Sequence, residues 1–261
     1  MTISDATRNT LRSEVNAWIE DFLRQKLPAV LRKNNANRGR MPFHEALLPN
    51  AVMSGFKTER SFSTSLGKLF ERCSVIIARE CFSHVQNQHV VHGMIPGNTK
   101  NAMDTLIDRL DQSQGYANYQ TVVNETIERM QRDNSAGSPV TVTSDLYLQN
   151  NDRDIYFELK SPKPNKGQCH TMLRNSLYIH AMTRRLWPRT RTMIGMAYNP
   201  FGDGAEYNHS FVTGIFDMKR QVRIGREYWD LLGGDDTYRQ LLDIFADVGD
   251  ESRAMIRDML D

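Results

Sequence analysis

Two carboxylates and a lysine in the middle of the chain have the residue types and the spacing that metal-assisted chemistry needs. Asp145 precedes a cluster of turn-forming residues, and Glu158 and Lys160 follow it on a segment that alternates apolar and polar residues. Because side chains alternate along a strand, Glu158 and Lys160 should share one face. A tight turn centred on Asn151 and Asp152 then predicts a hairpin with three opposed pairs: Gln149 with Asp154, Asp145 with Glu158, and Thr143 with Lys160.

Asp145 and Glu158, opposed in this way, would have Cβ atoms about 5 Å apart. Two opposed carboxylates destabilise a sheet unless a positive charge lies between them. Mg²⁺ prefers hard oxygen ligands and typically binds through one or two carboxylates, water and a substrate phosphate. We therefore expect Mg²⁺ at Asp145 and Glu158, with the peptide carbonyl of Leu159 as another ligand.

Lys160 is expected beside this metal, on the same face as Glu158. Its amine can hold or deprotonate an attacking water and offset charge at phosphorus. Together these groups suit in-line hydrolysis of a phosphodiester. The alternative is a surface hairpin with solvated side chains, since the tripeptide Glu-Leu-Lys is common.

Basic residues dominate the segment that follows. From Leu159 to Phe201 there is no Asp or Glu, which is the charge a polyanionic substrate needs beside a metal. Arg184 and Arg185 could instead lie on a solvated helix face, with no role in DNA binding. That alternative explains the loop at 161–168 poorly, because two prolines stiffen this loop and it carries residue types that read base edges. The DNA contacts predicted here are Lys163, Asn165, Lys166, Gln168 and, farther along, Arg174.

Three other places could contribute to a DNA site. Arg38 and Arg40 belong to a basic loop and are the type that contacts phosphates. Tyr198 and Asn199 begin a segment with turn chemistry, which is either a simple turn or a substrate-facing loop. Glu71, flanked on its helical face by small residues, is either a further catalytic and metal ligand or an ordinary exposed glutamate.

The elements that must position these residues are indicated by their periodicity. Helical spacing covers residues up to about Pro28 and then about 63–82, 100–112, 119–132, 168–187 and 226–261. Strand-like segments are 140–148, 154–160, 192–198 and 210–216. This order predicts an α/β fold, a mixed central β-sheet flanked by helices, with helical N- and C-terminal regions. We expect one domain over 1–261: a helical part to about 135, a sheet core at about 138–220 and a helical part at about 225–261.

Composition limits the class of protein. The 261 residues include 33 basic and 31 acidic ones, so nucleic-acid affinity has to come from the placement of charge. The cysteines, Cys73, Cys81 and Cys169, have no metal-binding spacing and are expected to be reduced. His84, His89 and His92 also lack a metal-ligand pattern. With no signal peptide and no apolar segment of membrane length, we expect a cytoplasmic protein without membrane attachment.

The catalytic residues resemble the PD-(D/E)xK nuclease superfamily. Ser144-Asp145 stands where that family has Pro-Asp, Glu158-Leu159-Lys160 supplies the second half, and Glu71 matches a glutamate that the family often takes from an earlier helix. The departure at Ser144 removes a proline that carries no chemistry. Three longer strings resemble type II restriction endonucleases that cut GGNCC-like sites: Arg60 to Gly67, Glu158 to Gln168 and Tyr198 to Gly202.

This resemblance implies a restriction-endonuclease-like fold and a homodimer that cuts double-stranded DNA at a near-palindromic site. Its restriction-modification system would include a cognate DNA methyltransferase. Two alternatives stay open: a repair or junction-resolving nuclease of the same superfamily, and a non-catalytic DNA-binding module. A pure binder has no need for clustered carboxylates near phosphate, which favours the nuclease.

Overall fold

A computed structural model describes residues 3–30, 42–47, 59–110 and 119–258 of the chain. The chain packs into two compact units, each made of segments that are distant in sequence. The helical unit comprises Met1–Cys81, Ala197–Ala205 and Ile224–Asp261, and the sheet unit comprises Phe82–Met196 and Glu206–Arg223. The expectation of one domain over residues 1–261 stays a prediction.

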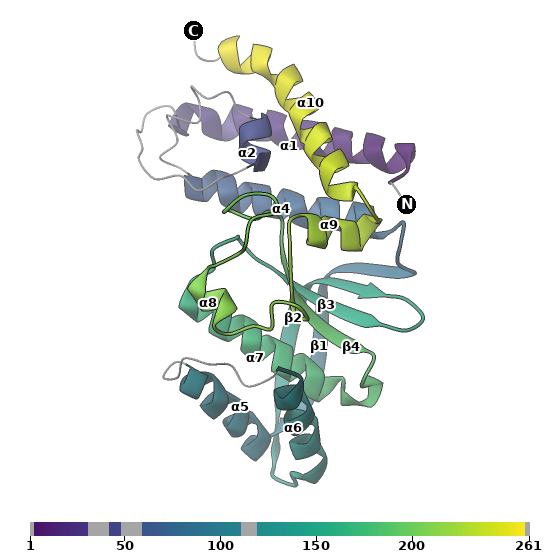
Figure 1. Cartoon of the computed structure of the whole chain (residues 1–261), viewed down its shortest axis with the longest axis vertical. Helices are drawn as coiled ribbons and strands as arrows, with labels where there is room; N and C mark the ends of the chain where they lie inside the picture. The colour runs from purple at the N-terminus through teal and green to yellow at the C-terminus, as the bar shows by residue number, and fades with distance from the viewer. Residues whose placement is uncertain (1–2, 31–41, 48–58, 111–118, 259–261) are drawn as a thin grey trace. The chain divides into compact units, whose positions relative to one another are not determined.

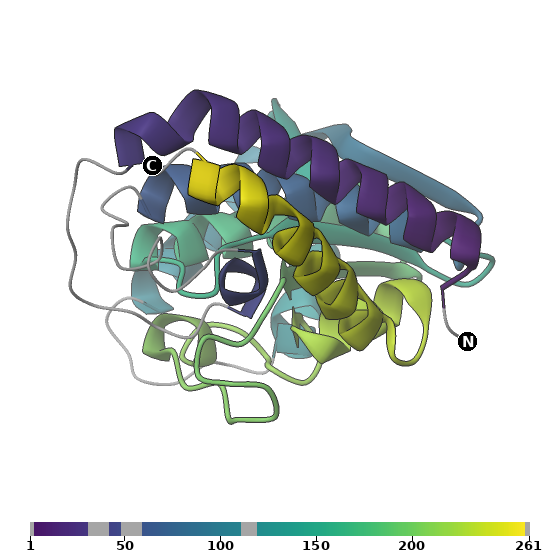
Figure 2. The ribbon, with the colours of Figure 1, turned by 90° about the horizontal axis from the view of Figure 1, so that it is seen from above.

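The helical unit combines helices from both ends of the chain. Its described helices are α1 (Asp5–Val30), α2 (Pro42–Leu47), α4 (Glu59–Ala78), α9 (Arg226–Gly233) and α10 (Thr237–Asp258). Helices α1 and α10 lie side by side, as the purple and yellow ribbons of Figures 1 and 2 show. The core of this unit is aromatic, with Phe22, Phe43, Phe62, Trp229 and Phe245 almost fully buried.

Helix α1 begins where the sequence indicates but ends later. The Ser4 hydroxyl accepts a hydrogen bond from Thr7 N (3.2 Å) and so caps the first turn. The expected end or kink at Pro28 is not an end, because α1 continues to Val30. A proline this close to a helix C-terminus removes only one backbone donor from the last turns, which limits its effect.

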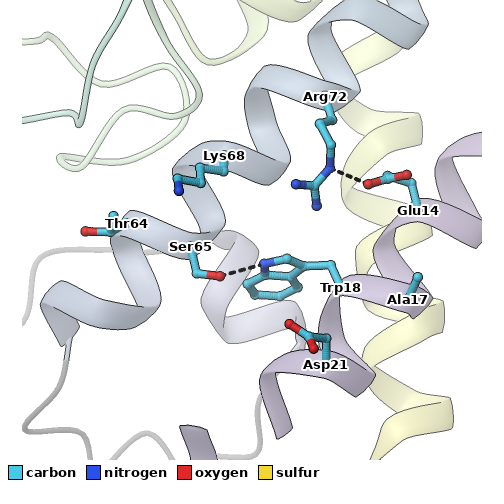
Figure 3. Close-up of a pocket in the computed structure, with 8 residues that line it drawn as sticks. All are labelled: Glu14, Ala17, Trp18, Asp21, Thr64, Ser65, Lys68 and Arg72. Carbon is cyan, nitrogen blue, oxygen red and sulfur yellow. Dashed lines mark hydrogen bonds and ion pairs between the residues drawn. The ribbon is translucent and has the colours of Figure 1, made fainter. Parts of the chain in front are cut away.

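A polar pocket of about 380 Å³ lies between α1 and α4 (Figure 3). Trp18 points toward α4, and its indole N–H donates to Ser65 Oγ (2.9 Å). Arg72 reaches from α4 to Glu14 on α1 in an ion pair. These contacts connect the two helices at their exposed edge, above the buried aromatic side chains.

The sheet unit contains the mixed sheet that the sequence predicts. In the described part of the chain, five strands are hydrogen-bonded in sequence order: β1 (His84–Pro96), β2 (Gly137–Gln149), β3 (Asp154–Leu159), β4 (Thr190–Met196) and β5 (Val222–Ile224). Strands β1, β2 and β3 pair antiparallel, whereas β3 and β4 are parallel. The helices of this unit are α5 (Gly97–Leu110), α6 (Tyr119–Arg132), α7 (Lys166–Met182) and α8 (Ser210–Thr213). Of these, α7 packs against the sheet and also contacts α5 and α6.

The predicted hairpin register is confirmed over four pairs. Gln149 lies opposite Asp154, and the ladder continues to the pair Leu146 and Phe157. The ladder ends at that pair, so the predicted pairs of Asp145 with Glu158 and of Thr143 with Lys160 are not part of it. Instead the Lys160 amide donates to Gly195 O on β4 (3.0 Å).

One strand expectation is wrong, and two strands were missed. The segment 210–216 was expected as a strand, but Ser210–Thr213 is helical, with Val212 buried and its neighbour Phe211 exposed. Two adjacent apolar residues do not alternate, so this pattern was weak. Strands β1 and β5 were not expected at all, because β1 has an irregular, mostly exposed burial pattern and β5 is only three residues long. The described residues contain no helix long and apolar enough to span a membrane.

Candidate active site

Asp145, Glu158 and Lys160 meet at the open end of the β2–β3 hairpin. The Lys160 ammonium lies 2.8 Å from Glu158 Oε1 and 3.8 Å from Asp145 Oδ2. All three side chains are largely withdrawn from water, with exposed fractions of 26% for Lys160, 19% for Asp145 and 17% for Glu158. The structure therefore brings together the catalytic residues that the sequence predicts.

Side chains replace backbone hydrogen bonds where the two strands part. Asp145 Oδ2 accepts the Leu159 amide (2.7 Å), and the Ser144 hydroxyl donates to Phe157 O (2.9 Å). The carboxylate of Asp145 is thus held by the backbone of the strand that carries Glu158. Ser144, which stands where the superfamily pattern has proline, is buried and contributes to this opening.

Burial raises the pKa of Glu158, and the nearby carboxylate of Asp145 raises it further. The charge of Lys160 and hydrogen bonds from Lys160 and Asn175 act in the opposite direction. Asn175 lies on α7, which packs against the sheet. The sequence reading missed Asn175, since an asparagine inside a helix gives no signal of the strand it will contact.

Gln88 on β1 is the second residue that sequence reasoning missed. Its side-chain amide donates to Asp145 Oδ1 (3.3 Å). The register of β1 against β2 runs without a shift from His84 to Pro96, which sets Gln88 opposite Asp145. Without a predicted strand at β1, no sequence signal could place it there.

The donor set suits a hard divalent cation. Two carboxylates and one ammonium leave the cluster with a net negative charge. Leu159, whose carbonyl is the further predicted ligand, ends β3 between Glu158 and Lys160 in the sequence. No group of three or more His, Cys, Asp or Glu residues gathers anywhere in the described chain. Mg²⁺ fits such a site, because it is usually bound through one or two carboxylates plus substrate phosphate rather than by an all-protein cage.

The loop after Lys160 is held at both ends. Asn165 Oδ1 accepts Gln168 N (2.9 Å) and Gln168 Oε1 accepts Asn165 N (2.8 Å), a capping box that starts α7. On the other side, the Tyr207 hydroxyl donates to Pro162 O (2.6 Å) and His209 Nε2 donates to Pro164 O (2.8 Å). The side-chain oxygens of Asn165 and Gln168 therefore already have structural partners.

The remaining predicted DNA contacts have varied surroundings. Lys163 is exposed on the loop after Lys160, and Lys166 is exposed at the start of α7. Arg174, farther along α7, forms an ion pair with Asp104 (2.9 Å). Tyr198 is buried in the helical unit, where Asn199 makes the expected turn by accepting Phe201 N (3.0 Å). The roles of all these residues in DNA binding stay predictions.

Three further predicted site residues stay predictions. Glu71 is half-buried on α4, within the helical unit. Arg38 and Arg40 lie outside the described residues.

The histidines and cysteines have the structural roles expected of them. His89 stacks on Tyr147 with ring centroids 4.3 Å apart, and His92 Nδ1 lies 3.0 Å from Thr141 Oγ1. All three cysteines are free thiols. Burial raises the pKa of Cys73 to about 12 and that of Cys169 to about 11, which keeps both thiols protonated and unreactive.

Comparisons with known proteins identify the family of this chain. The family model described as type II restriction endonuclease, HinfI, matches residues 7–249. The type II restriction enzymes HgiCII and HgiEI of Herpetosiphon aurantiacus are each 32% identical to this chain; the matches cover 95% of it and 96% and 95% of those relatives. MjaII of Methanocaldococcus jannaschii, also a type II restriction enzyme, is 23% identical over 80% of this chain and 62% of its own length. The chain belongs to the HinfI family of type II restriction endonucleases.

Proposed function

We propose that this endonuclease hydrolyses double-stranded DNA with Mg²⁺ held by Asp145, Glu158 and the Leu159 carbonyl, and with Lys160 acting on the attacking water. The observation that carries the proposal is the position of the Lys160 ammonium between two half-buried carboxylates. This cluster supports assignment to the PD-(D/E)xK superfamily. It also favours a nuclease over a silent DNA-binding module, and the family favours restriction over repair.

The residues divide the work of an in-line displacement. Asp145 and Glu158 would hold the cation next to the scissile phosphate, where Mg²⁺ would supply charge stabilisation at phosphorus and a more acidic water. Lys160, which pairs with Glu158, would hold the attacking water and offset the negative charge that develops. One bond forms from the water oxygen to phosphorus as the water gives up a proton. The bond to the leaving strand end breaks, and its oxygen takes up a proton. The products are a phosphate monoester and a hydroxyl.

Plasmid digestion tests this assignment. Purified enzyme should cut a plasmid of known sequence in Mg²⁺ and stop in excess EDTA. Asp145→Ala should abolish cutting, whereas Asp152→Ala should not, since Asp152 is an exposed carboxylate in the turn of the same hairpin. Full cutting in EDTA, or by Asp145→Ala, would remove the proposed metal site. Glu71→Ala is expected to reduce activity, and wild-type activity would return Glu71 to a surface role.

We further propose a near-palindromic GGNCC-like site, read by a homodimer in which each protomer meets one half-site. The partner enzyme would be a methyltransferase that protects the same site in the cytoplasm. Mapping the plasmid ends gives the site. Light scattering that shows a monomer both free and on cognate DNA would contradict the dimer.

The loop after Lys160 is the proposed base reader. Alanine at Lys163 or Lys166 should lower the preference for the cognate site, because a lysine contact to guanine contributes about 1–3 kcal/mol of discrimination. Alanine at Arg38 or Arg40 should weaken binding to every duplex alike. Asn165→Ser keeps an N-cap oxygen but removes the amide, so it separates base reading from helix capping.

Binding constants on cognate and one-base-changed duplexes at two salt concentrations decide between these roles. If the Lys163 and Lys166 variants lose affinity equally on all duplexes, this loop contacts only the DNA backbone. The segment from Tyr198 to Gly204 would then be the next place to look for the base contacts.

A further inference from the structure

Strand β1 has an unusual backbone at Gln88. This residue has a φ of 50°, in the left-handed region that non-glycine residues seldom adopt. The pairing of β1 with β2 keeps one register from His84 to Pro96, yet Gln88 and Asp145 form the position at which Cα pairing is interrupted. Left-handed residues of this kind persist where the surrounding structure holds them, and they cluster at active sites.

The unusual backbone coincides with two contacts on the face that carries Asp145. Gln88 Nε2 donates to Asp145 Oδ1 (3.3 Å). The next residue, His89, has its Cα opposite that of Ser144, whose hydroxyl donates to the hairpin backbone at Phe157 O. In a regular strand the His89 side chain would therefore lie on the same face as Ser144. The His89 ring instead stacks on Tyr147, which follows Asp145 by two positions and so lies on the same face as Asp145. The left-handed backbone at Gln88 thus coincides with a break in the alternation of side chains along β1, beside the carboxylate of Asp145.

Both oxygens of Asp145 are consequently held by donors from different strands. Oδ2 accepts the Leu159 amide at 2.7 Å from β3, and Oδ1 accepts the Gln88 amide from β1. A neutral amide orients a carboxylate without cancelling its charge. A lysine at position 88 would instead compete with a cation for the same oxygen.

We propose that Gln88 is a positioning residue that fixes the orientation of Asp145 for cation binding. This inference rests on the proposed function, in which Asp145 is a metal ligand. Partners that hydrogen-bond a ligating carboxylate set its direction, and their loss typically lowers metal affinity or activity by about 10–100-fold. Gln88 has the geometry of such a partner.

The test compares Gln88→Gly with Gln86→Gly. Glycine adopts a φ of 50° without strain, so Gln88→Gly removes the amide donor while permitting the backbone. Gln86 lies two residues away on the same strand and contacts His89 rather than Asp145. Mn²⁺ binding to the DNA-free protein, followed by electron paramagnetic resonance, should be about 10-fold weaker in Gln88→Gly and unchanged in Gln86→Gly.

A second measurement is the Mg²⁺ concentration for half-maximal plasmid cleavage, which should rise in Gln88→Gly alone. Equal Mn²⁺ binding and equal Mg²⁺ dependence in Gln88→Gly and the wild type would overturn the inference. If Gln88→Gly does not fold, Gln88→Asn replaces it. Asparagine also tolerates left-handed backbone, but its shorter side chain falls short of Asp145. Wild-type Mn²⁺ binding by that variant would equally overturn the inference.

Asp145→Ala separates this inference from the proposed function. If Asp145→Ala loses Mn²⁺ binding and cleavage while Gln88→Gly keeps both, only the role of Gln88 fails. If Asp145→Ala still binds Mn²⁺ and cuts DNA like the wild type, the metal site itself is wrong, and the role of Gln88 fails with it.

Discussion

The helical unit and the sheet unit bury different kinds of polar side chain. Among the described residues of the helical unit, the buried polar side chains are hydroxyls and amides, which carry no charge: Ser74, Thr237, Gln240 and Ser252. In the sheet unit, Asp154 and His180 are buried as well, and the carboxylates of the candidate active site are largely withdrawn from water. Among the described residues, acidic and histidine side chains are therefore buried only in the sheet unit.

The partners of these groups differ in the same way. In the helical unit, the Ser74 and Ser252 hydroxyls donate to carbonyls of their own helices, and charged residues such as Arg72 pair at the surface. In the sheet unit, Asp154 accepts hydrogen bonds from Tyr147 (2.7 Å) and Gln149 (3.0 Å) and lies beside Arg189. Burying charge costs free energy, so it is maintained where structure or chemistry requires it. The free-energy cost of burying charge therefore falls on the sheet unit, which contains the candidate active site.

The largest expected difference between the units is catalytic. Lys160→Ala should lower the DNA cleavage rate by about 10²–10³-fold, because it removes the charge that stabilises the transition state. Lys68→Ala, which removes an exposed lysine from the pocket of Figure 3, should leave the rate within about twofold. Single-turnover cleavage with saturating enzyme measures both rates. Equal losses in the two variants would mean that the cluster at Lys160 has no special role.

The next difference concerns ion pairs and stability. Arg189→Ala leaves the Asp154 side chain, only 2% exposed, without its cation. We expect a loss of about 2 kcal/mol in the free energy of unfolding, less than for a fully buried pair because Arg189 itself is half-exposed. Arg72→Ala breaks a surface pair with Glu14 and should cost at most about 1 kcal/mol.

Urea unfolding of the two arginine variants at neutral pH provides the comparison. The double variant Arg189→Ala, Asp154→Asn should regain part of the loss, since it removes the uncompensated charge. If the double variant is less stable than Arg189→Ala alone, the cost does not come from a buried charge.

A further difference appears on acidification. Burial lowers the pKa of His180 from 6.5 to about 3, with the charge of Arg191 as a further cause. Between these two values the unfolded chain binds a proton that the folded protein excludes, so stability falls as the pH drops from 6.5 toward 3. The slope contributed by one such group is at most about 1.4 kcal/mol per pH unit.

His180→Gln should therefore flatten the fall in stability between pH 6.5 and pH 4, relative to the wild type. His92→Gln is the matched control, because His92 is exposed on β1. Denaturant unfolding at several pH values measures the slopes, and identical slopes for all three proteins would show that His180 is not the group that titrates.

The smallest expected effects are at helix caps, one in each unit. Asn165→Ala removes the capping box of α7, and Ser4→Ala removes the cap of α1. Each should cost about 1 kcal/mol of stability. Thermal unfolding measures both losses. A much larger loss for Asn165→Ala would indicate that the cap also holds the loop clamped by Tyr207 and His209.

Much of the catalytic centre was predictable because it is local in sequence. The turn residues around Asn151 set the β2–β3 register, and the four pairs from Gln149 to Leu146 follow it. A two-residue turn leaves little freedom in how its strands pair, so Asp145, Glu158 and Lys160 could be placed together without a structure. The long helices were predictable for a similar reason, since their apolar spacing is a property of each segment alone.

The contacts made by residues distant in sequence depended on the tertiary structure. Gln88 reaches Asp145 from 57 positions away, and Asn175 contacts Glu158 from a helix on the other side of the loop. The end of the β2–β3 ladder was also decided by tertiary contacts, because the Leu159 amide donates to the Asp145 side chain instead of to the backbone of β2. Periodicity reports which side of an element is apolar, but not which strand or helix will cover it. The amino-acid sequence by itself determined the chemistry available to this protein, whereas only the tertiary structure decided how the carboxylates are oriented and neutralised.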